Sequence, residues 1–310
     1  MANEYGFRPK TIADLNGQPK IQKMLKVYIK AAEIKGESFP HTIVTGPSGC
    51  GKSTTAMVIA NELGRPYKAF AAPAINDVKT IQQILIDIKE NDVIYLDEIH
   101  RLNKKLQEML YFAMEQFQAD VEMDGKAVRI GIPHFTLIAS TNLYGGLNDA
   151  LLNRFPIQLK LAAYNDDSMT TIVKTICKSK GIKIDNESAS MIAATTRGVP
   201  RNANSYVARI YDFALVMNNG IITPDIVVDG FDIMGINKYG LNQDDMDYLR
   251  FLASNTKAVG IDTCALTLGM DKDTIITKIE PYLLKKKYIQ KQPRGRVATG
   301  LGRKICEETN

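Results

Sequence analysis

The chain has 310 residues, enough for about two or three compact units that each bury a core. Apolar residues make up 45% of it and charged residues 24%, an ordinary globular composition that excludes disordered and fibrous classes. The formal net charge is only +5, but no acidic residue lies between Glu280 and Glu307, where many lysines and arginines gather, so this end is predicted to bind a polyanion.

The N-terminal residues are polar and do not resemble a secretory signal, and no apolar run approaches the ~20 residues needed to span a bilayer. We therefore expect a cytoplasmic protein without a membrane partner. The four cysteines are far apart, and with only three histidines no metal-ligand spacing occurs. Any metal is expected to arrive with a nucleotide.

Residues 1–162 alternate apolar, strand-like runs with amphipathic, helical ones, which predicts an α/β domain with a parallel sheet. The expected helices include 19–35 and 78–89. An Asp-Gly pair within alternating residues predicts a β-hairpin over 119–132. The expected strands are 42–45, 67–71, 93–96, 135–139 and 157–161.

A glycine-rich segment follows the first expected strand and precedes a helical stretch. Its glycines let backbone N–H groups converge on a β-phosphate, and the helix directs its positive end there. Lys52 is expected to neutralise the β/γ charge and the Ser53 hydroxyl to ligate Mg²⁺, which predicts a site for ATP or ADP. The segment comprises Gly46, Pro47, Ser48, Gly49, Cys50, Gly51, Lys52, Ser53 and Thr54.

Polar residues end two further expected strands. Asp97 is expected to hold Mg²⁺ through its water shell, and Glu98 to orient and activate the attacking water. A strand that merely ends in solvated acids is the less favoured alternative, because the phosphate-binding loop completes a phosphoryl-transfer set. Thr141 and Asn142 are candidate sensors of the γ-phosphate, although small polar residues after a strand are as often turn formers.

Two arginines are candidates for stabilising charge in the transition state of phosphoryl transfer. Arg154 could project toward the nucleotide of a neighbouring subunit. Arg201 opens a helix of the second domain and could close over the γ-phosphate of its own subunit. For a lone arginine a surface ion pair is the commoner role, so both assignments depend on the whole set.

Beyond the α/β part, residues 163–238 carry only helical signals and predict a small helical domain, with 235–240 as a linker. Residues 239–310 are expected to form helices over 244–254, 262–268 and 273–284 and then a basic hairpin over 288–299. Three helices with such a hairpin make a variant of the helix-turn-helix.

The motifs in this order resemble the AAA+ ATPases, and longer strings from Arg8 to Thr299 resemble the RuvB family of Holliday-junction branch-migration motors. The most specific strings are Asp97-Glu98-Ile99-His100-Arg101-Leu102-Asn103 and Pro293-Arg294-Gly295-Arg296-Val297-Ala298-Thr299. The resemblance implies an AAA+ large domain (1–162), a helical lid (163–238) and a winged helix (239–310).

The same resemblance implies a hexameric ring that hydrolyses ATP at subunit interfaces and pumps double-stranded DNA of a four-way junction, in recombination and repair. It also implies a RuvA-like partner bound by the 119–132 hairpin. Lys291, Arg294 and Arg296 are expected to contact DNA phosphates, which position a motor without reading sequence.

The chain departs from the family pattern at four places, of which the hairpin leaves docking to a standard RuvA open. Asn142 stands where the family tends to have threonine. A second arginine beside Arg154 is missing, the arginine-rich helix after Arg201 is replaced, and the hairpin carries Glu122 and Asp124. An alternative function is an AAA+ clamp or helicase loader, which would leave the basic wing unexplained. A DNA-binding regulator with a degenerate ATPase is disfavoured, because the nucleotide motifs are intact.

Overall fold

The computed structural model describes residues 7–123 and 126–309. The residues group into two compact units: one runs to Thr175 and includes Gly198–Asn204, and the other consists of Ile176–Arg197 and the chain from Ser205 onward. The domain borders expected near residues 162 and 238 stay a prediction. None of the helices in the described part is both long and apolar enough to cross a membrane.

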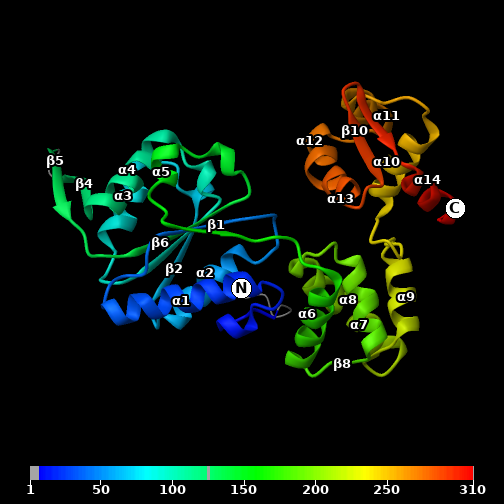
Figure 1. Cartoon of the computed structure of the whole chain (residues 1–310), viewed down its shortest axis with the longest axis horizontal. Helices are drawn as coiled ribbons and strands as arrows, with labels where there is room; N and C mark the ends of the chain where they lie inside the picture. Colours follow the sequence, from blue (N-terminus) through cyan, green and yellow to red (C-terminus); the bar gives the residue numbers. More distant parts are fainter. Residues whose placement is uncertain (1–6, 124–125, 310) are drawn as a thin grey trace. The chain divides into compact units, whose positions relative to one another are not determined.

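The first unit contains a five-stranded parallel sheet in the order β2-β3-β6-β1-β7 (Figure 1). In the register, Thr45 lies opposite Thr141, and Leu96 lies opposite Ala139. The carboxyl ends of β1, β3 and β6 therefore meet at one edge of the sheet, where parallel α/β sheets bind ligands. The strands are β1 (Thr42–Thr45), β2 (Tyr67–Ala71), β3 (Val93–Asp97), β6 (Thr136–Thr141) and β7 (Ile157–Lys160). All five predicted strands are present, within two residues at each end.

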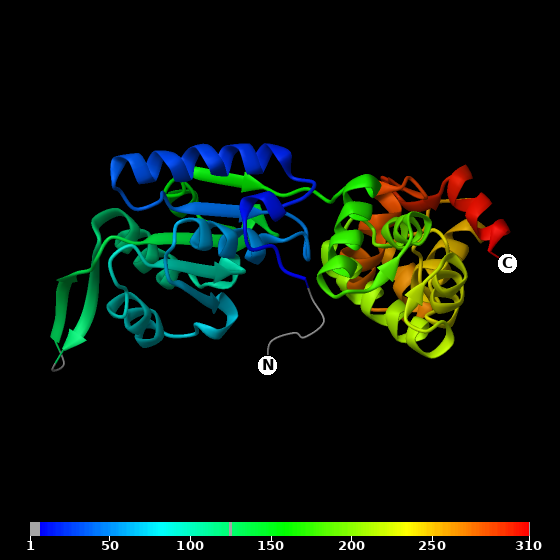
Figure 2. The ribbon, with the colours of Figure 1, turned by 90° about the horizontal axis from the view of Figure 1, so that it is seen from below.

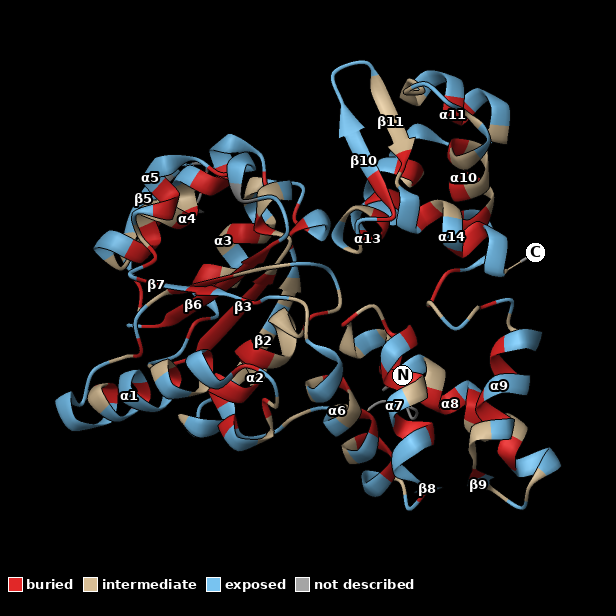
Figure 3. Cartoon of the chain, turned by 45° about the vertical axis from the view of Figure 1, so that its right-hand side comes forward, coloured by how far each residue is buried: buried red, intermediate tan, exposed pale blue. Residues whose placement is uncertain are grey.

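Helices cover both faces of the sheet, so its three central strands, β1, β3 and β6, are buried on both sides (Figures 2 and 3). Because side chains alternate along a strand, Ile94 and Leu96 of β3 pack with α3 and α4, whereas Val93 and Tyr95 pack with α1 and α2. The helices are α1 (Pro19–Lys35), α2 (Lys52–Glu62), α3 (Val78–Ile86), α4 (Lys104–Gln116) and α5 (Asp149–Leu152), with short 3₁₀ turns η1 (Ile12–Asp14), η2 (Ala72–Ala74), η3 (Ile99–Arg101) and η4 (Tyr144–Gly146).

The predicted hairpin is present as β4 (Gln118–Met123) and β5 (Lys126–Gly131), an antiparallel pair that projects from the rest of the unit (Figure 1). Ala119 and Val121 of β4 are buried and pack in the hydrophobic core of the unit. Asp124, at its turn, lies outside the described residues, and so does the polar N-terminus, residues 1–6.

The predicted helical domain is formed by α6 (Asp166–Ser179), α7 (Asn186–Thr195), α8 (Pro200–Met217) and α9 (Pro224–Ile233). The expectation of helices alone was wrong in one detail: Lys183–Ile184 (β8) and Ile221–Ile222 (β9) pair as short parallel strands. Each strand follows a glycine in left-handed conformation, Gly181 and Gly220, which ends the preceding turn and leaves the chain extended.

The C-terminal part forms α10 (Gln243–Ser254), α11 (Ile261–Leu268) and a third helical segment, followed by the predicted hairpin, β10 (Ile289–Gln292) and β11 (Gly295–Ala298). The third segment contains a π-helical turn that ends two residues before Pro281, and proline lacks the N–H that a regular helix would bond. Its pieces are α12 (Lys272–Thr274), η5 (Ile275–Ile279) and α13 (Glu280–Lys285).

A last helix, α14 (Gly300–Glu308), was not predicted. The Thr299 side chain caps it by accepting from the Gly302 N–H at 3.1 Å, and Ile305 and Cys306 face the core of this part. Val259 pairs with Arg296 through two backbone hydrogen bonds of 2.8 and 2.9 Å, an isolated β-bridge beside the two-stranded wing.

Candidate functional site

The phosphate-binding loop lies between β1 and α2, at the edge of the sheet where three strands end. At Gly46 φ is +145°, and a Cβ there would lie 2.5 Å from the Leu161 carbonyl oxygen. Gly51, with φ of 99°, is the N-cap of α2. The first amides of α2 and its positive end are therefore available to an anion at this loop.

Lys52 folds back over the loop, where its ammonium donates to the carbonyl oxygens of Gly46 at 2.9 Å and Pro47 at 3.0 Å. Burial lowers the pKa of Lys52, and the nearby charge of Asp97 opposes this shift. The Cys50 side chain is fully buried, so this residue can serve a nucleotide only through its backbone.

Asp97, at the end of β3, is held by three donors on one carboxylate oxygen. The Tyr95 hydroxyl lies 3.0 Å from Oδ1 and 2.9 Å from Ser140 Oγ, and the Ser140 hydroxyl also donates to Oδ1. The backbone N–H of Glu98 reaches the same oxygen at 3.1 Å. Burial raises the pKa of Tyr95, so its hydroxyl stays protonated and keeps its role as donor. These contacts fix the carboxylate and commit Oδ1, which leaves the other oxygen for a metal-bound water.

Glu98 adopts a left-handed backbone conformation with φ of 55°, which costs a non-glycine residue about 1 kcal/mol. The turn redirects the chain into η3, whose Arg101 N–H donates to the Glu98 carbonyl at 2.8 Å. Strain of this kind is concentrated at functional sites. Glu98 is partly exposed beside the carboxylate of Asp97, where a catalytic base is needed.

Thr141 and Asn142 follow β6, but the two side chains differ. The Thr141 hydroxyl is buried, lies 3.0 Å from His100 Nδ1 and accepts from the Leu143 N–H at 3.0 Å. Burial lowers the pKa of His100, which favours the neutral ring in this contact. Asn142 is exposed at the end of the strand. Of the two predicted sensors, Asn142 is therefore the better placed.

Arg201 reaches the phosphate-binding loop. Its N–H donates to the Gly49 carbonyl at 3.4 Å, and its guanidinium donates to Ser48 Oγ at 3.3 Å. A Cβ on Gly49 would lie 2.7 Å from Val199 Cγ1 and 3.0 Å from Arg201 Cβ, so a glycine is needed where these segments meet. The structure thus brings the second predicted arginine to the loop of its own chain.

Arg154 follows α5, and its side chain packs against α4. Its Nη2 lies 2.7 Å from Glu115 Oε1, and its Cζ lies 5.3 Å from the centre of the Tyr111 ring. About a third of each charged side chain remains exposed. Arg154 therefore joins an ion pair within its own chain rather than the loop set around Lys52.

Among the predicted DNA contacts, the structure gives Arg296 a different role. Its Nε donates to Glu280 Oε1 at 2.5 Å, and only 13% of its side chain is exposed. The fully buried Glu280 also accepts from the Tyr248 hydroxyl at 2.8 Å and from Lys291, whose side chain is 50% exposed, at 2.8 Å. The expectation that Arg296 contacts DNA stays a prediction, and in this structure its charge is paired with that of Glu280. Arg294, at the turn of the wing, is exposed.

Sequence reasoning missed Tyr95, Ser140 and His100. The alternation of β3 offered a signal for Tyr95, which stands two residues before Asp97 and so shares its face of the sheet. Ser140 and His100 come from other segments of the chain, and only the pairing of β3 with β6 brings Ser140 to Asp97. Among the described residues, no cluster of three or more His, Cys, Asp and Glu side chains suggests another metal site.

Comparison with known proteins gives the same family over nearly all of the described chain. Residues 7–161 match the model for the Holliday junction DNA helicase RuvB P-loop domain, 164–237 the RuvB AAA lid domain and 238–307 the RuvB C-terminal winged helix domain. These matches confirm the predicted architecture, an AAA+ domain with a helical lid and a winged helix.

Two similar proteins are both called Holliday junction branch migration complex subunit RuvB. One, from Wolbachia sp. subsp. Brugia malayi, is 38% identical over 96% of this chain and 92% of its own length. The other, from Campylobacter hominis, is 38% identical over 98% and 90%. The solved structure of the Thermotoga maritima RuvB Holliday junction branch migration motor has a TM-score of 0.85 at 33% identity and covers 97% of this chain and 98% of its own. The chain belongs to the RuvB family.

Proposed function

We propose that this protein is an ATP-driven motor that moves the branch point of Holliday junctions, in recombination and repair. The observation that carries this proposal is the presence, in one chain, of a nucleotide site and a winged helix with a basic wing. Its relatives are named for branch migration and for a complex of which they are subunits. A protein that acts on chromosomal DNA in this way would be located in the bacterial cytoplasm.

ATP would bind with its β-phosphate on the loop amides and the first turn of α2. Lys52 would exchange its two loop carbonyls for β- and γ-phosphate oxygens. The oxygen donors of Ser53 and Asp97 fit Mg²⁺, which prefers hard ligands and keeps several waters. The ion would neutralise charge on the β- and γ-phosphates when bound.

In hydrolysis, Glu98 would orient a water against the γ-phosphorus and accept its proton as the bond to the β,γ-bridging oxygen breaks, leaving ADP and phosphate. Asn142 would contact the γ-phosphate from the end of β6. Arg201 would move from Ser48 to the γ-phosphate, to which its charge is attracted. Each of these groups belongs to the same chain.

Arg154 would act on a neighbouring subunit, in a ring that we propose to be a hexamer. About a third of Arg154 and of Glu115 is exposed, so solvent screens their ion pair in part and a subunit interface could exchange it for another contact. A subunit interface would exclude water there and present the guanidinium to the phosphates of the next copy. Because the second arginine of the family pattern is absent, this contribution would rest on Arg154 alone.

Duplex DNA of the junction would be held by phosphate contacts from Arg294 and the exposed part of Lys291, without reading sequence. The β4–β5 hairpin would hold a RuvA-like junction-binding partner. On this hairpin Arg129 pairs with Asp120 at 2.7 Å and lies 4.6 Å above the Phe112 ring. A partner matched to it would therefore offer polar groups as well as an apolar pocket.

A synthetic four-way junction with fluorophores on two arms tests the function. The protein, with a RuvA-like partner present and absent, should separate the arms with ATP but not with a non-hydrolysable analogue. Glu98→Gln should bind ATP yet lose hydrolysis and arm separation, and retained turnover would refute the role of Glu98. ATP hydrolysis by the parent protein without arm separation under any condition would favour the loader function.

A further inference from the structure

Arg197 lies at the point where the chain passes from one compact unit to the other. Arg197 is the last residue of the stretch that begins at Ile176, and Gly198 already belongs to the unit of the nucleotide site. Both have left-handed backbones, with φ of 61° and 71°. Gly198 is fixed there, because its carbonyl accepts from the Tyr164 N–H at 2.9 Å and a Cβ would lie 2.4 Å from the Tyr164 carbonyl oxygen.

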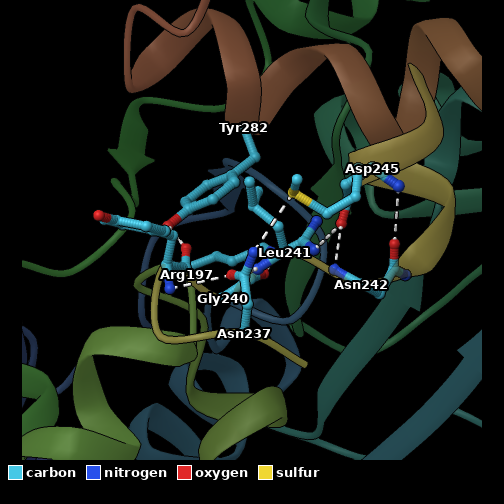
Figure 4. Close-up of polar contacts among 9 residues, drawn as sticks. Arg197, Asn237, Gly240, Leu241, Asn242, Asp245 and Tyr282 are labelled. Carbon is cyan, nitrogen blue, oxygen red and sulfur yellow. Dashed lines mark hydrogen bonds and ion pairs between the residues drawn. The ribbon is translucent and has the colours of Figure 1, made fainter. Parts of the chain in front are cut away.

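Unlike Gly198, which contacts Tyr164, Arg197 directs its guanidinium to residues at the start of the winged-helix part (Figure 4). Its Nε donates to the Gly240 carbonyl at 2.9 Å, and its Nη2 donates to the Asp245 carboxylate. Its Cζ lies 4.8 Å from the centre of the Tyr282 ring. The Asp245 side chain is only 2% exposed and that of Arg197 18%, so most of this ion pair is shielded from solvent, and the planar groups of both partners make it directional.

The segment that receives Arg197 is itself held by hydrogen bonds. Asn237 Oδ1 accepts from the N–H groups of Tyr239 and Leu241, both at 3.0 Å. The Asp245 carboxylate accepts from the Asn242 N–H at 2.9 Å and completes the capping box of α10. The predicted linker over 235–240 is therefore an ordered turn.

This turn also lies against the lid. At Gly240 φ is +71°, and a Cβ would lie 2.8 Å from the carbonyl oxygen of Thr195, at the end of α7. The backbone contact of Gly240 with Thr195 and the side-chain contacts of Arg197 therefore both connect the lid helices to the segment that leads into α10.

We propose that Arg197 is a positioning residue that locks the lid and the winged helix into one body. Movement of residues 198–201 at the phosphate-binding loop during ATP turnover is then passed to the wing. Arg201, which contacts the loop through Ser48 and Gly49, is only four residues from Arg197 along the chain. The lock rests on the geometry of the second unit, whereas its use in coupling rests on the proposed function.

Distance measurement between two spin labels tests the lock without DNA or ATP turnover. Val216 on α8 and Leu266 on α11 are each 87% exposed and suit Val216→Cys and Leu266→Cys, while the native cysteines are buried and do not take up label. The parent should give one narrow distance distribution. Arg197→Met should broaden it.

Two further variants keep this experiment decisive. Asp245→Asn retains the shape of the capping box but loses the charge that binds Arg197, and it should broaden the distribution as well. Arg209→Met removes an arginine of the same part whose pair with Asp212 is about half exposed, and it should leave the distribution narrow. Unchanged widths in both Arg197→Met and Asp245→Asn would overturn the proposal.

Coupling is read from the number of base pairs migrated per ATP hydrolysed. Arg197→Met should keep its DNA-free ATP turnover within about twofold but lower this ratio at least about fivefold, the lower end of typical coupling between sites. An unchanged ratio beside a broadened distribution would also overturn the proposal. A parent protein that moves no junction would refute the proposed function alone, because the distance experiment contains no DNA.

Discussion

The buried carboxylate under the wing offers a sharp test of why the wing holds its shape. Glu280 is fully buried and accepts from Arg296, Lys291 and the Tyr248 hydroxyl. Glu280→Gln keeps the shape but removes the charge, so the 13%-exposed Arg296 loses the carboxylate to which it donates. Removing one partner of a buried pair costs about 3–5 kcal/mol, and because half of Lys291 is solvated we expect the lower figure, about 3 kcal/mol.

Hydrogen exchange of the full-length protein measures this cost where it arises. If the wing opens locally, about 3 kcal/mol corresponds to roughly hundredfold faster exchange of the amides in β10 and β11. The control is Asp262→Asn, whose pair with Lys272 lies in the same part but is largely exposed, and it should change exchange by about fivefold at most. Equal effects of the two variants would refute the reasoning.

The pH dependence gives a second check on Glu280. Burial by itself would raise the pKa of Glu280, but the hydrogen bonds from Arg296, Lys291 and Tyr248 outweigh it and hold the pKa below its usual value. Since the folded-state pKa is depressed, this stabilisation is present above the unfolded-state pKa near 4.5 and is lost as the pH falls through the folded-state pKa. The difference between parent and Glu280→Gln should therefore shrink in acid.

Three further outcomes are expected. Tyr95→Phe and Ser140→Ala each remove a hydrogen bond to the Asp97 carboxylate, which is worth about 1.5 kcal/mol. Each variant should therefore raise the Mg²⁺ concentration for half-maximal ATPase activity about tenfold, and unchanged Mg²⁺ titrations would contradict this. Arg154→Ala and Lys52→Ala should each be inactive, while their mixture should regain part of the ATPase at mixed interfaces, and intact rings without recovery would count against action in trans. Burial lowers the pKa of His41 from 6.5 to about 4, so on acidification the unfolded chain takes up a proton before the folded one does. The free energy of unfolding should therefore fall by up to about 3 kcal/mol between those pH values. His41→Gln should lack this fall, and a flat profile in the parent would exclude His41 as its cause.

The sheet and the phosphate-binding loop were predictable because their signals are local. Apolar runs with short turns located the strands, and the spacing of glycines before Lys52 demands one loop geometry. The setting of Asp97 was only half predictable. A period of two puts Tyr95 on its face, but Ser140 reaches it from β6, which follows β3 only after a helix and a hairpin.

The basic C-terminal run shows why charge counts mislead. The basic run was defined as the stretch between Glu280 and Glu307, so Glu280 itself was left out of the charge count. Yet Glu280 forms ion pairs with Arg296 of β11 and Lys291 of β10. The hairpin folds back over α13, so the acid that borders the run in sequence lies beneath it in space. Part of the basic run predicted to bind a polyanion is thus neutralised inside the fold, whereas Lys285, Lys287, Lys291, Arg294 and Lys304 are exposed.

Arg197 and Arg201 show the same limit in a motif that was recognised. The sequence presents them as one string, Arg197-Gly198-Val199-Pro200-Arg201, in which only the last arginine had an expected role. The left-handed pair at 197 and 198 turns the two side chains to different partners, the Asp245 carboxylate and the phosphate-binding loop. A string of five residues therefore contains both ends of a connection between ATP and the wing, and its first arginine is as informative as its last.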